Sequence, residues 1–153
     1  MKESLDDARE ELKRVDHLIY VSLKYTRTVD VLLNVIKRLI DAYDFAIDAI
    51  LGYAQEKGML EEDIPTNPLS KADLILKKFH DPVIKDNIEL YLLFRKIVKA
   101  DYERFNEYRR HVTLKTMVDN RDIEIKIDNI TEYYNIIKEF VKYIDNLINE
   151  VKE

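Results

Sequence analysis

The sequence predicts an all-α fold, an antiparallel bundle of four to five helices that forms one domain over residues 1–153. Only 2 Gly and 3 Pro occur in the chain. Because these residues mark turns, their scarcity indicates few and long elements. Apolar residues make up 46% of the chain and recur with helical spacing along its long segments. Helices with one apolar face must bury those faces against one another, which favours a bundle.

The first two helices are predicted over residues 4–24 and 28–57. In the first, apolar residues from Leu5 to Ile19 recur every three or four positions and form one stripe. The second has a wider apolar face, which is typical of a helix at the centre of a bundle. Gly58 follows it as a natural C-terminal stop.

Two further helices are predicted after the segment "MLEEDIPTNPLS", which contains two prolines and is expected to be a loop. Ser70 is predicted to cap a short helix over residues 71–79. Asp81 and Pro82 then predict a new helix start, with Asp81 as the N-cap. This helix is expected to continue to His111 or beyond.

The segments "HVTLKTMV" and "IEIKI" alternate polar and apolar residues around "DNRD". The sequence therefore also allows a short β-hairpin near residues 112–127, with a four-residue loop. The alternative is that the preceding helix continues into Met117. The last helix is predicted over residues 129–151, with Asp128 as its N-cap.

The composition excludes several classes of protein. The chain has no Cys, which excludes disulfides, thiolate catalysis and sulfur-ligated zinc. Gly52 and Gly58 are too isolated to form a phosphate-binding glycine loop. The first residues are charged and no apolar stretch is long enough for a membrane span, so a cytoplasmic location is expected. High charge with a single Gln hints at a thermophile, although nine Asn weaken that hint.

Metal and cofactor chemistry has little basis in the sequence. The three histidines are far apart, and no Glu-x-x-His pair of the di-iron type is present. Asp41, Asp44 and Asp48 share one helical face, so they can hold a cation such as Mg²⁺ or form a solvated stripe. The stripe is the favoured interpretation, and no cofactor is expected.

Positive charge is concentrated in one part of an acidic chain. The net charge is −5, yet residues 95–115 contain seven basic and three acidic residues. Such segregation indicates an anionic partner. Within this window, the stretch "ADYERFNEYRRHVT" places Arg104 and His111 seven residues apart, on one face of the expected helix and about 10 Å from each other.

These residue types suit phosphate chemistry. Arginine can hold a phosphate with two donors, and histidine can transfer a proton near neutral pH. Arg104 and His111 are therefore predicted as a catalytic pair for metal-free RNA cleavage. The predicted substrate-binding residues are Asn106, Tyr108, Arg109, Arg110 and Lys115. The alternative is an ordinary basic helix end that complements the helix dipole.

Two other polar features bear on this prediction. The segment "YTRTVD" is expected to be a bend or helix junction, or a polar lining that faces the basic window. Arg27 and Asp30 within it can pair on a helix surface. Ten tyrosines are spread over the long helices, which favours a self-interface over stacking of nucleic-acid bases.

The segment from Arg104 to His111 resembles the Arg-x(4–6)-His motif of the HEPN superfamily, with six residues between the two. The resemblance implies a small helical domain, often dimeric, in which Arg and His of two protomers meet. It implies that Arg104 holds the scissile phosphate and that His111 transfers the proton. Phe105 stands where active members usually have a polar residue. Thr113 stands where toxins silenced by a partner nucleotidyltransferase have Tyr.

The leading functional prediction is a homodimeric, HEPN-like domain that binds RNA or cleaves it without a metal. The competing prediction is a non-enzymatic interaction module, in which the tyrosine-rich faces form a homodimer or bind a partner protein. The two differ in one respect: an Arg104 or His111 engaged in intramolecular salt bridges favours the module.

Overall fold

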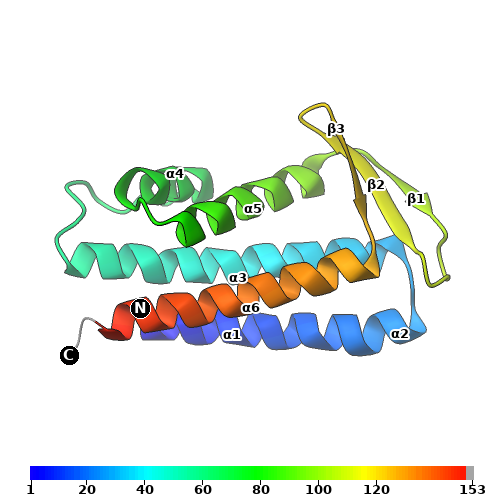
Figure 1. Ribbon diagram of the computed structural model, residues 1–153, viewed down its shortest axis with the longest axis horizontal. Helices are drawn as coiled ribbons and strands as arrows, with labels where there is room; N and C mark the ends of the chain where they lie inside the picture. Colours follow the sequence, from blue (N-terminus) through cyan, green and yellow to red (C-terminus); the bar gives the residue numbers. More distant parts are fainter. Residues whose placement is uncertain (151–153) are drawn as a thin grey trace.

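The computed structural model describes residues 1–150, which are mostly helical, with five helices and a small three-stranded antiparallel sheet. The first helix is continuous from α1 through a π-helical turn, η1, to α2 (Figure 1). The elements are α1 Lys2–His17, η1 Leu18–Ser22, α2 Leu23–Tyr25, α3 Val29–Glu56, α4 Pro68–Lys78, α5 Pro82–Lys99, β1 Tyr102–Phe105, β2 Thr113–Val118, β3 Arg121–Ile125 and α6 Ile127–Glu150. Residue 151, the expected end of the last helix, lies outside the described part.

The helices form the antiparallel bundle that the sequence predicts. Helix α3 lies at the centre and packs against α1, α4, α5 and α6. Helices α1 and α5 run in one direction along the long axis of the molecule, and α3 and α6 run in the other (Figure 1). The small sheet lies at the end where α3 and α6 begin.

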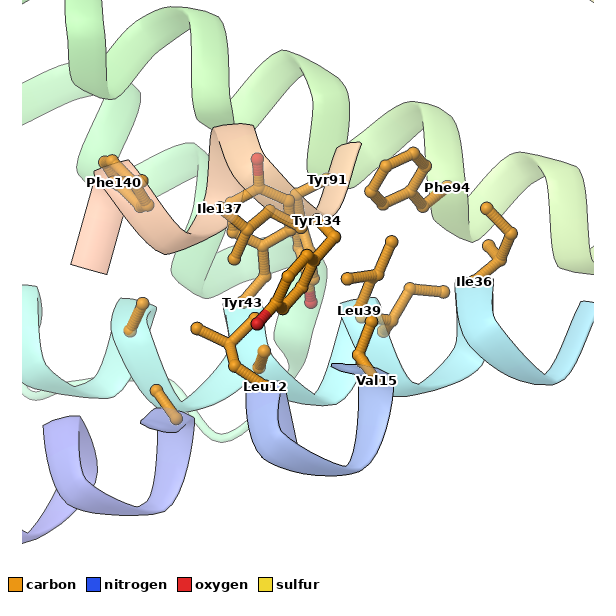
Figure 2. Packing of buried hydrophobic residues seen from close by; sticks show 14 of the residues in the cluster. Leu12, Val15, Ile36, Leu39, Tyr43, Tyr91, Phe94, Tyr134, Ile137 and Phe140 are labelled. Carbon is orange, nitrogen blue, oxygen red and sulfur yellow. The ribbon is translucent and has the colours of Figure 1, made fainter. Parts of the chain in front are cut away.

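The core is built around the ring of Tyr43 on α3, which is fully buried. The rings of Tyr91, Phe94 and Phe140 lie 5.8, 6.1 and 5.9 Å from it, centroid to centroid. Figure 2 shows these rings between the apolar residues that α1, α3 and α6 contribute. The Tyr43–Tyr91 and Tyr43–Phe140 pairs are edge-to-face and the Tyr43–Phe94 pair is tilted. Rings in such arrangements pack favourably, and here they join three helices. The wide apolar face predicted for α3 is confirmed.

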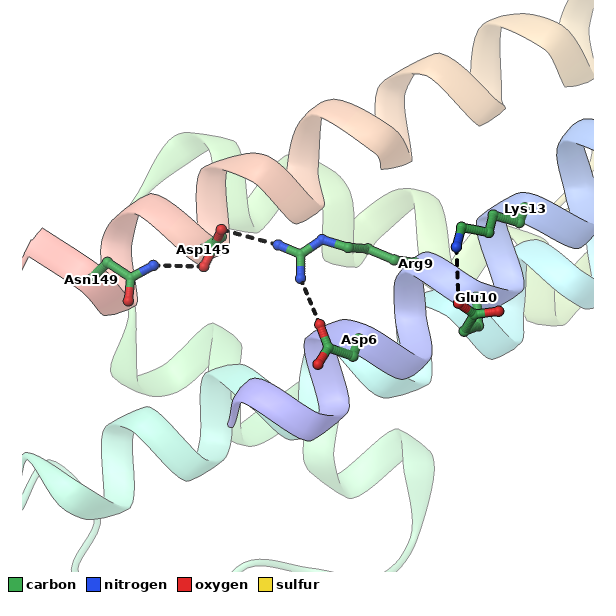
Figure 3. Close-up of polar contacts among 6 residues, drawn as sticks. All are labelled: Asp6, Arg9, Glu10, Lys13, Asp145 and Asn149. Carbon is green, nitrogen blue, oxygen red and sulfur yellow. Dashed lines mark hydrogen bonds and ion pairs between the residues drawn. The ribbon is translucent and has the colours of Figure 1, made fainter.

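Ion pairs on the surface add to the contact between α1 and α6. The Arg9 guanidinium lies 3.0 Å from the carboxylates of both Asp6 and Asp145 (Figure 3). The Asn149 side-chain amide donates to Asp145, which holds this carboxylate in place. These side chains are largely exposed, so each pair contributes less than about 1 kcal/mol.

Of the predicted N-cap residues of the later helices, one is confirmed and two are wrong. The Asp81 carboxylate accepts from the Val83 and Ile84 N–H groups, which confirms the predicted cap of α5. Ser70 is not a cap: the Asn67 side chain caps α4, and Pro68 occupies the first helical position. Asp128 is not a cap either, because α6 begins one residue earlier.

The fourth helix is shorter than predicted, and this changes the geometry of the whole basic segment. Helix α5 ends at Lys99, and Ala100 is already extended. Residues 102–105 form the unpredicted strand β1, which pairs with β2 from Tyr102 opposite Thr116 to Phe105 opposite Thr113. Leu114 and Val118 of β2 are buried, so the pairing covers one end of the core.

The hairpin allowed by the alternating pattern is confirmed as β2 and β3. Its turn is tighter than expected, because Arg121 and Asp122 of "DNRD" belong to β3. Asp119 and Asn120 both have positive φ, 53° and 64°. That conformation is typical of the two-residue hairpin turn that matches strand twist.

Candidate anion-binding site

Three segments meet at the sheet end of the bundle and surround a cavity of about 270 Å³. They are the α2–α3 turn, the β1–β2 loop and the β3–α6 junction, at the right of Figure 1. We call this cavity the basic pocket. Its lining residues are Arg27, Arg110, His111, Lys126, Ile127 and Asp128.

Hydrogen bonds hold the β1–β2 loop against the α2–α3 turn. The Tyr108 N–H donates to the Arg27 carbonyl oxygen at 2.6 Å. The Glu107 carboxylate accepts from the Val29 N–H at 3.1 Å and so adds a cap to α3, beside the Thr28 hydroxyl. Arg27 and Arg110 are thereby brought to one cavity from segments more than 80 residues apart in the chain.

The loop contains strained backbone. Asn106 and Tyr108 have φ values of 55° and 65°. Asn tolerates this left-handed region, but a bulky side chain rarely adopts it. The Tyr108 ring is nevertheless 76% exposed, so the strain is not offset by burial of the ring. Such outliers are more frequent at ligand-binding sites than elsewhere.

Arg104 does not belong to the basic pocket. It lies on β1, where its guanidinium is 2.7 Å from the Asp30 carboxylate and 3.7 Å from that of Glu107. The hydrogen bond to Asp30 raises the pKa of Arg104 and lowers the pKa of Asp30. Two carboxylates therefore neutralise the charge that was predicted to hold a phosphate.

The predicted helical face shared by Arg104 and His111 is wrong. Arg104 is in a strand and His111 is in the turn that precedes β2, because the helix expected to carry both ends at Lys99. His111 lines the basic pocket with its neighbour Arg110. Its carbonyl oxygen accepts from the hydroxyl of Thr113, which fixes the turn.

Four of the predicted residues lie outside the pocket lining: Asn106, Tyr108, Arg109 and Lys115. The Asn106 side chain donates to the His111 carbonyl oxygen at 3.4 Å, which makes it a part of the loop structure. Lys115 lies on β2 with its ammonium 6.0 Å from the centre of the Phe105 ring. Tyr108 and Arg109 are exposed on the loop outside the pocket lining.

Two cations of the pocket were not predicted as site residues. Arg27 belongs to the segment "YTRTVD", which is confirmed as a helix junction between α2 and α3. The segment also contacts the basic segment, which lies in a strand and a loop and not in the expected helix. The expected Arg27–Asp30 pair is wrong, because Asp30 pairs with Arg104. For Lys126, the sequence offers no motif or charge cluster that would predict a site residue; it lies between β3 and α6.

Some donors of the residues that line the pocket are not saturated by acceptors in the described part of the chain. The Arg27 Nε is buried and has no hydrogen-bond partner within residues 1–150. Helix α6 begins at the pocket, and the first N–H groups of a helix have no acceptor within it. Lys126 is only loosely paired, 3.9 Å from the Glu124 carboxylate on the exposed side. These groups together suit an anion.

The alternative of a cation site at Asp41, Asp44 and Asp48 has no support among residues 1–150. No group of three acidic or histidine side chains within residues 1–150 has the arrangement of a metal site. Asp48 is paired with Lys71 at 2.8 Å, and Asp44 accepts from the Tyr91 hydroxyl at 2.5 Å. Burial raises the pKa of Asp44 and also that of Asp41.

A larger groove, of about 900 Å³, lies along α6 and the start of α5. Val83 and Ile136 are part of its apolar lining and are partly exposed, and Phe140 lies at its buried side. Its charged lining residues are Asp128, Glu132, Glu139 and Lys142, so the groove is acidic overall.

Comparison of the chain with protein-family models, with curated proteins and with solved structures finds no match. None of the helices within residues 1–150 combines the length and the apolar character that crossing a membrane requires. The function must therefore be argued from the geometry of the sheet end itself.

Proposed function

We propose that the sheet end of this protein binds single-stranded RNA, with backbone phosphate at the basic pocket. The observation that carries the proposal is the convergence of Arg27, Arg110 and Lys126 on one cavity in a protein of net charge −5. Electrostatic contacts to phosphate provide much of the affinity for nucleic acid. An acidic protein that concentrates three cations in one place favours a local anionic ligand over general attraction.

Two exposed aromatic residues lie in the segments that form the pocket and suit unpaired bases. Tyr25 is 79% exposed and Tyr108 is 76% exposed. Tyr25 lies two residues before Arg27, and Tyr108 is hydrogen-bonded to the Arg27 backbone. Base stacking on such a ring contributes about 1–3 kcal/mol per base. Phosphate-binding cations beside exposed rings are the usual combination in single-strand-binding proteins.

Binding is favoured over cleavage by the state of Arg104. Its ion pairs with Asp30 and Glu107 engage the Arg104 guanidinium, the group that was predicted to hold the scissile phosphate for His111. The resemblance to the HEPN superfamily depended on a motif within one long helix, and Arg104 and His111 are not in a helix. Membership of that superfamily stays a prediction. Dimerisation stays a prediction as well.

The test is fluorescence anisotropy with a labelled single-stranded RNA in EDTA over a range of salt concentrations. Wild type is expected to bind with an affinity that falls as salt rises. Arg110→Ala is expected to weaken binding about tenfold or more, because a charge-assisted contact is lost. The matched control is Lys77→Ala, which removes an exposed cation of α4 at a distance from the sheet end (Figure 1).

Two results would contradict the proposal. One is the absence of salt-dependent binding, and the other is an equal effect of Arg110→Ala and Lys77→Ala. Gel analysis of the same RNA tests the enzymatic alternative. If wild type cleaves the RNA and His111→Ala does not, the ribonuclease prediction is right and binding alone is the wrong description.

The second candidate function is the interaction module, which the α5–α6 groove favours. Its acidic rim and apolar lining suit a basic amphipathic helix of a partner protein. Ile136→Asp would place a charge among the apolar lining residues and is expected to abolish such binding. A synthetic amphipathic helix with lysines beside its apolar face is the probe, and an acidic helix of equal length is the control. Equal binding of both helices would reject this candidate.

A further inference from the structure

From the charges at the basic pocket, we infer that it is selective for a terminal phosphate monoester of the RNA over an internal phosphodiester. This inference rests on the proposed function and specifies its ligand. An internal phosphodiester carries one negative charge. A monoester at a chain end carries about −1.5 to −2 at neutral pH.

The charge of the pocket lining matches the monoester. Arg27, Arg110 and Lys126 are positive and Asp128 is negative, so the lining carries +2 when His111 is neutral. A phosphodiester would leave one of these charges uncompensated, whereas a dianion balances both. The Glu124 carboxylate, 3.9 Å from the Lys126 ammonium, lies outside the pocket lining on an exposed side chain.

The arrangement of donors also favours a chain end. The cations come from three segments that enclose a cavity of about 270 Å³, below the range usual for drug-sized ligands. A terminal phosphate needs one connection to the rest of the RNA, but an internal one needs room for the chain to enter and to leave. The exposed tyrosines lie outside the lining, where the nucleotides next to the end can stack.

The state of the Arg27 side chain is compatible with a further acceptor. Its Nε is buried without an acceptor in the described part of the chain, and a buried donor without a partner is unfavourable. Arg27 also lines the cavity, so the part of its guanidinium that faces the cavity can donate to one oxygen of a dianion while Arg110 and the start of α6 donate to the others.

The experiment compares three forms of one internally labelled 12-nucleotide RNA at fixed salt: with a 5′-phosphate, with a 3′-phosphate, and with hydroxyls at both ends. One of the phosphorylated forms is expected to bind about tenfold or more tightly than the hydroxyl form. The two phosphorylated forms decide which end is bound.

Variants distinguish the pocket from general attraction. Arg110→Ala and Lys126→Ala are expected to remove the preference for the phosphorylated end. Arg109→Ala is the matched control, because this neighbouring arginine is exposed outside the lining. It is expected to weaken all three RNAs alike and to keep the preference.

Equal binding of the three RNAs by wild type would overturn the inference and leave the proposed function standing. Loss of the preference in Arg109→Ala to the same extent as in Arg110→Ala would also overturn it. Absence of binding to any of the three would reject the proposed function itself, so the two failures are distinguishable.

Discussion

The hydrogen bond between Tyr43 and Asn87 gives a sharp test of how the bundle is held together. The Tyr43 hydroxyl donates to the Asn87 side-chain oxygen at 2.7 Å, and this contact joins the central helix α3 to α5. The Tyr43 side chain is fully buried and Asn87 is nearly so. Burial raises the pKa of Tyr43, so its hydroxyl stays a donor throughout the ordinary pH range.

Tyr43→Phe removes the donor and leaves the ring in place, so no large cavity forms. The Asn87 oxygen then has no donor within the described chain, although the α5–α6 groove gives water access to this residue on one side. We expect the free energy of unfolding to fall by about 1–2 kcal/mol, the lower part of the range for an unsatisfied buried group. In a domain of this size that corresponds to a decrease of roughly 3–6 °C in the melting temperature.

Asn87→Ala removes the acceptor and leaves the Tyr43 hydroxyl without a partner. Because the two single changes break the same hydrogen bond, the double variant is expected to be more stable than the sum of the single effects predicts. The coupling energy should be about 1 kcal/mol, within the range for residues in contact.

The measurement is urea unfolding of wild type and the three variants, followed by circular dichroism at 222 nm. Additive effects, with a coupling energy below about 0.3 kcal/mol, would refute the reasoning, because residues that do not interact are additive to that degree. A marked dependence of the coupling on pH between 6 and 9 would also contradict it, since neither group should titrate there.

Further predictions concern Asp44, Thr28 and Tyr108. Burial raises the pKa of Asp44, so the folded protein holds this proton more tightly than the unfolded chain, and stability is lost as the pH rises from about 4 through the folded pKa. Asp44→Asn should therefore reduce the dependence of the melting temperature on pH between about 4 and 7. An unchanged slope in the variant would contradict this. Thr28→Ala removes the hydroxyl cap of α3 and should cost about 1 kcal/mol in urea unfolding; no change would show that Glu107 suffices as a cap. Tyr108→Asn relieves the strain at φ 65° and should raise stability by up to about 1 kcal/mol but weaken RNA binding, and equal affinity would exclude stacking on this ring.

Much of the bundle could be predicted from the sequence because its determinants are local. The spacing of apolar residues along α3 predicts both a helix and its burial on several sides. Asp81 and Pro82 define the start of α5 through contacts within a few residues. The alternating pattern after Val112 predicts strands because side chains of a strand point to opposite faces in turn.

The end of α5 could not be predicted in the same way. Residues 100–111 contain no Gly and no Pro, and their charged residues tolerate a helix. Helix α5 ends because residues 102–105 pair with β2. This contact is between segments separated in the chain, so no local sequence pattern predicts it. Because the helix was predicted to continue, Arg104 and His111 were expected on one helical face. In the structure Arg104 is in a strand and His111 is in a turn.

By itself, the sequence determined the helical class, the central position of α3 and the concentration of positive charge in one window of an acidic chain. Only the tertiary structure decided which of those charges are free. Asp30, which is 74 residues from Arg104 in the chain, neutralises it, and Arg27 and Lys126 join Arg110 from two other segments. The physical reason is that helix formation depends on neighbours in sequence, whereas the electrostatic state of a side chain depends on whatever charges the folded chain brings near to it.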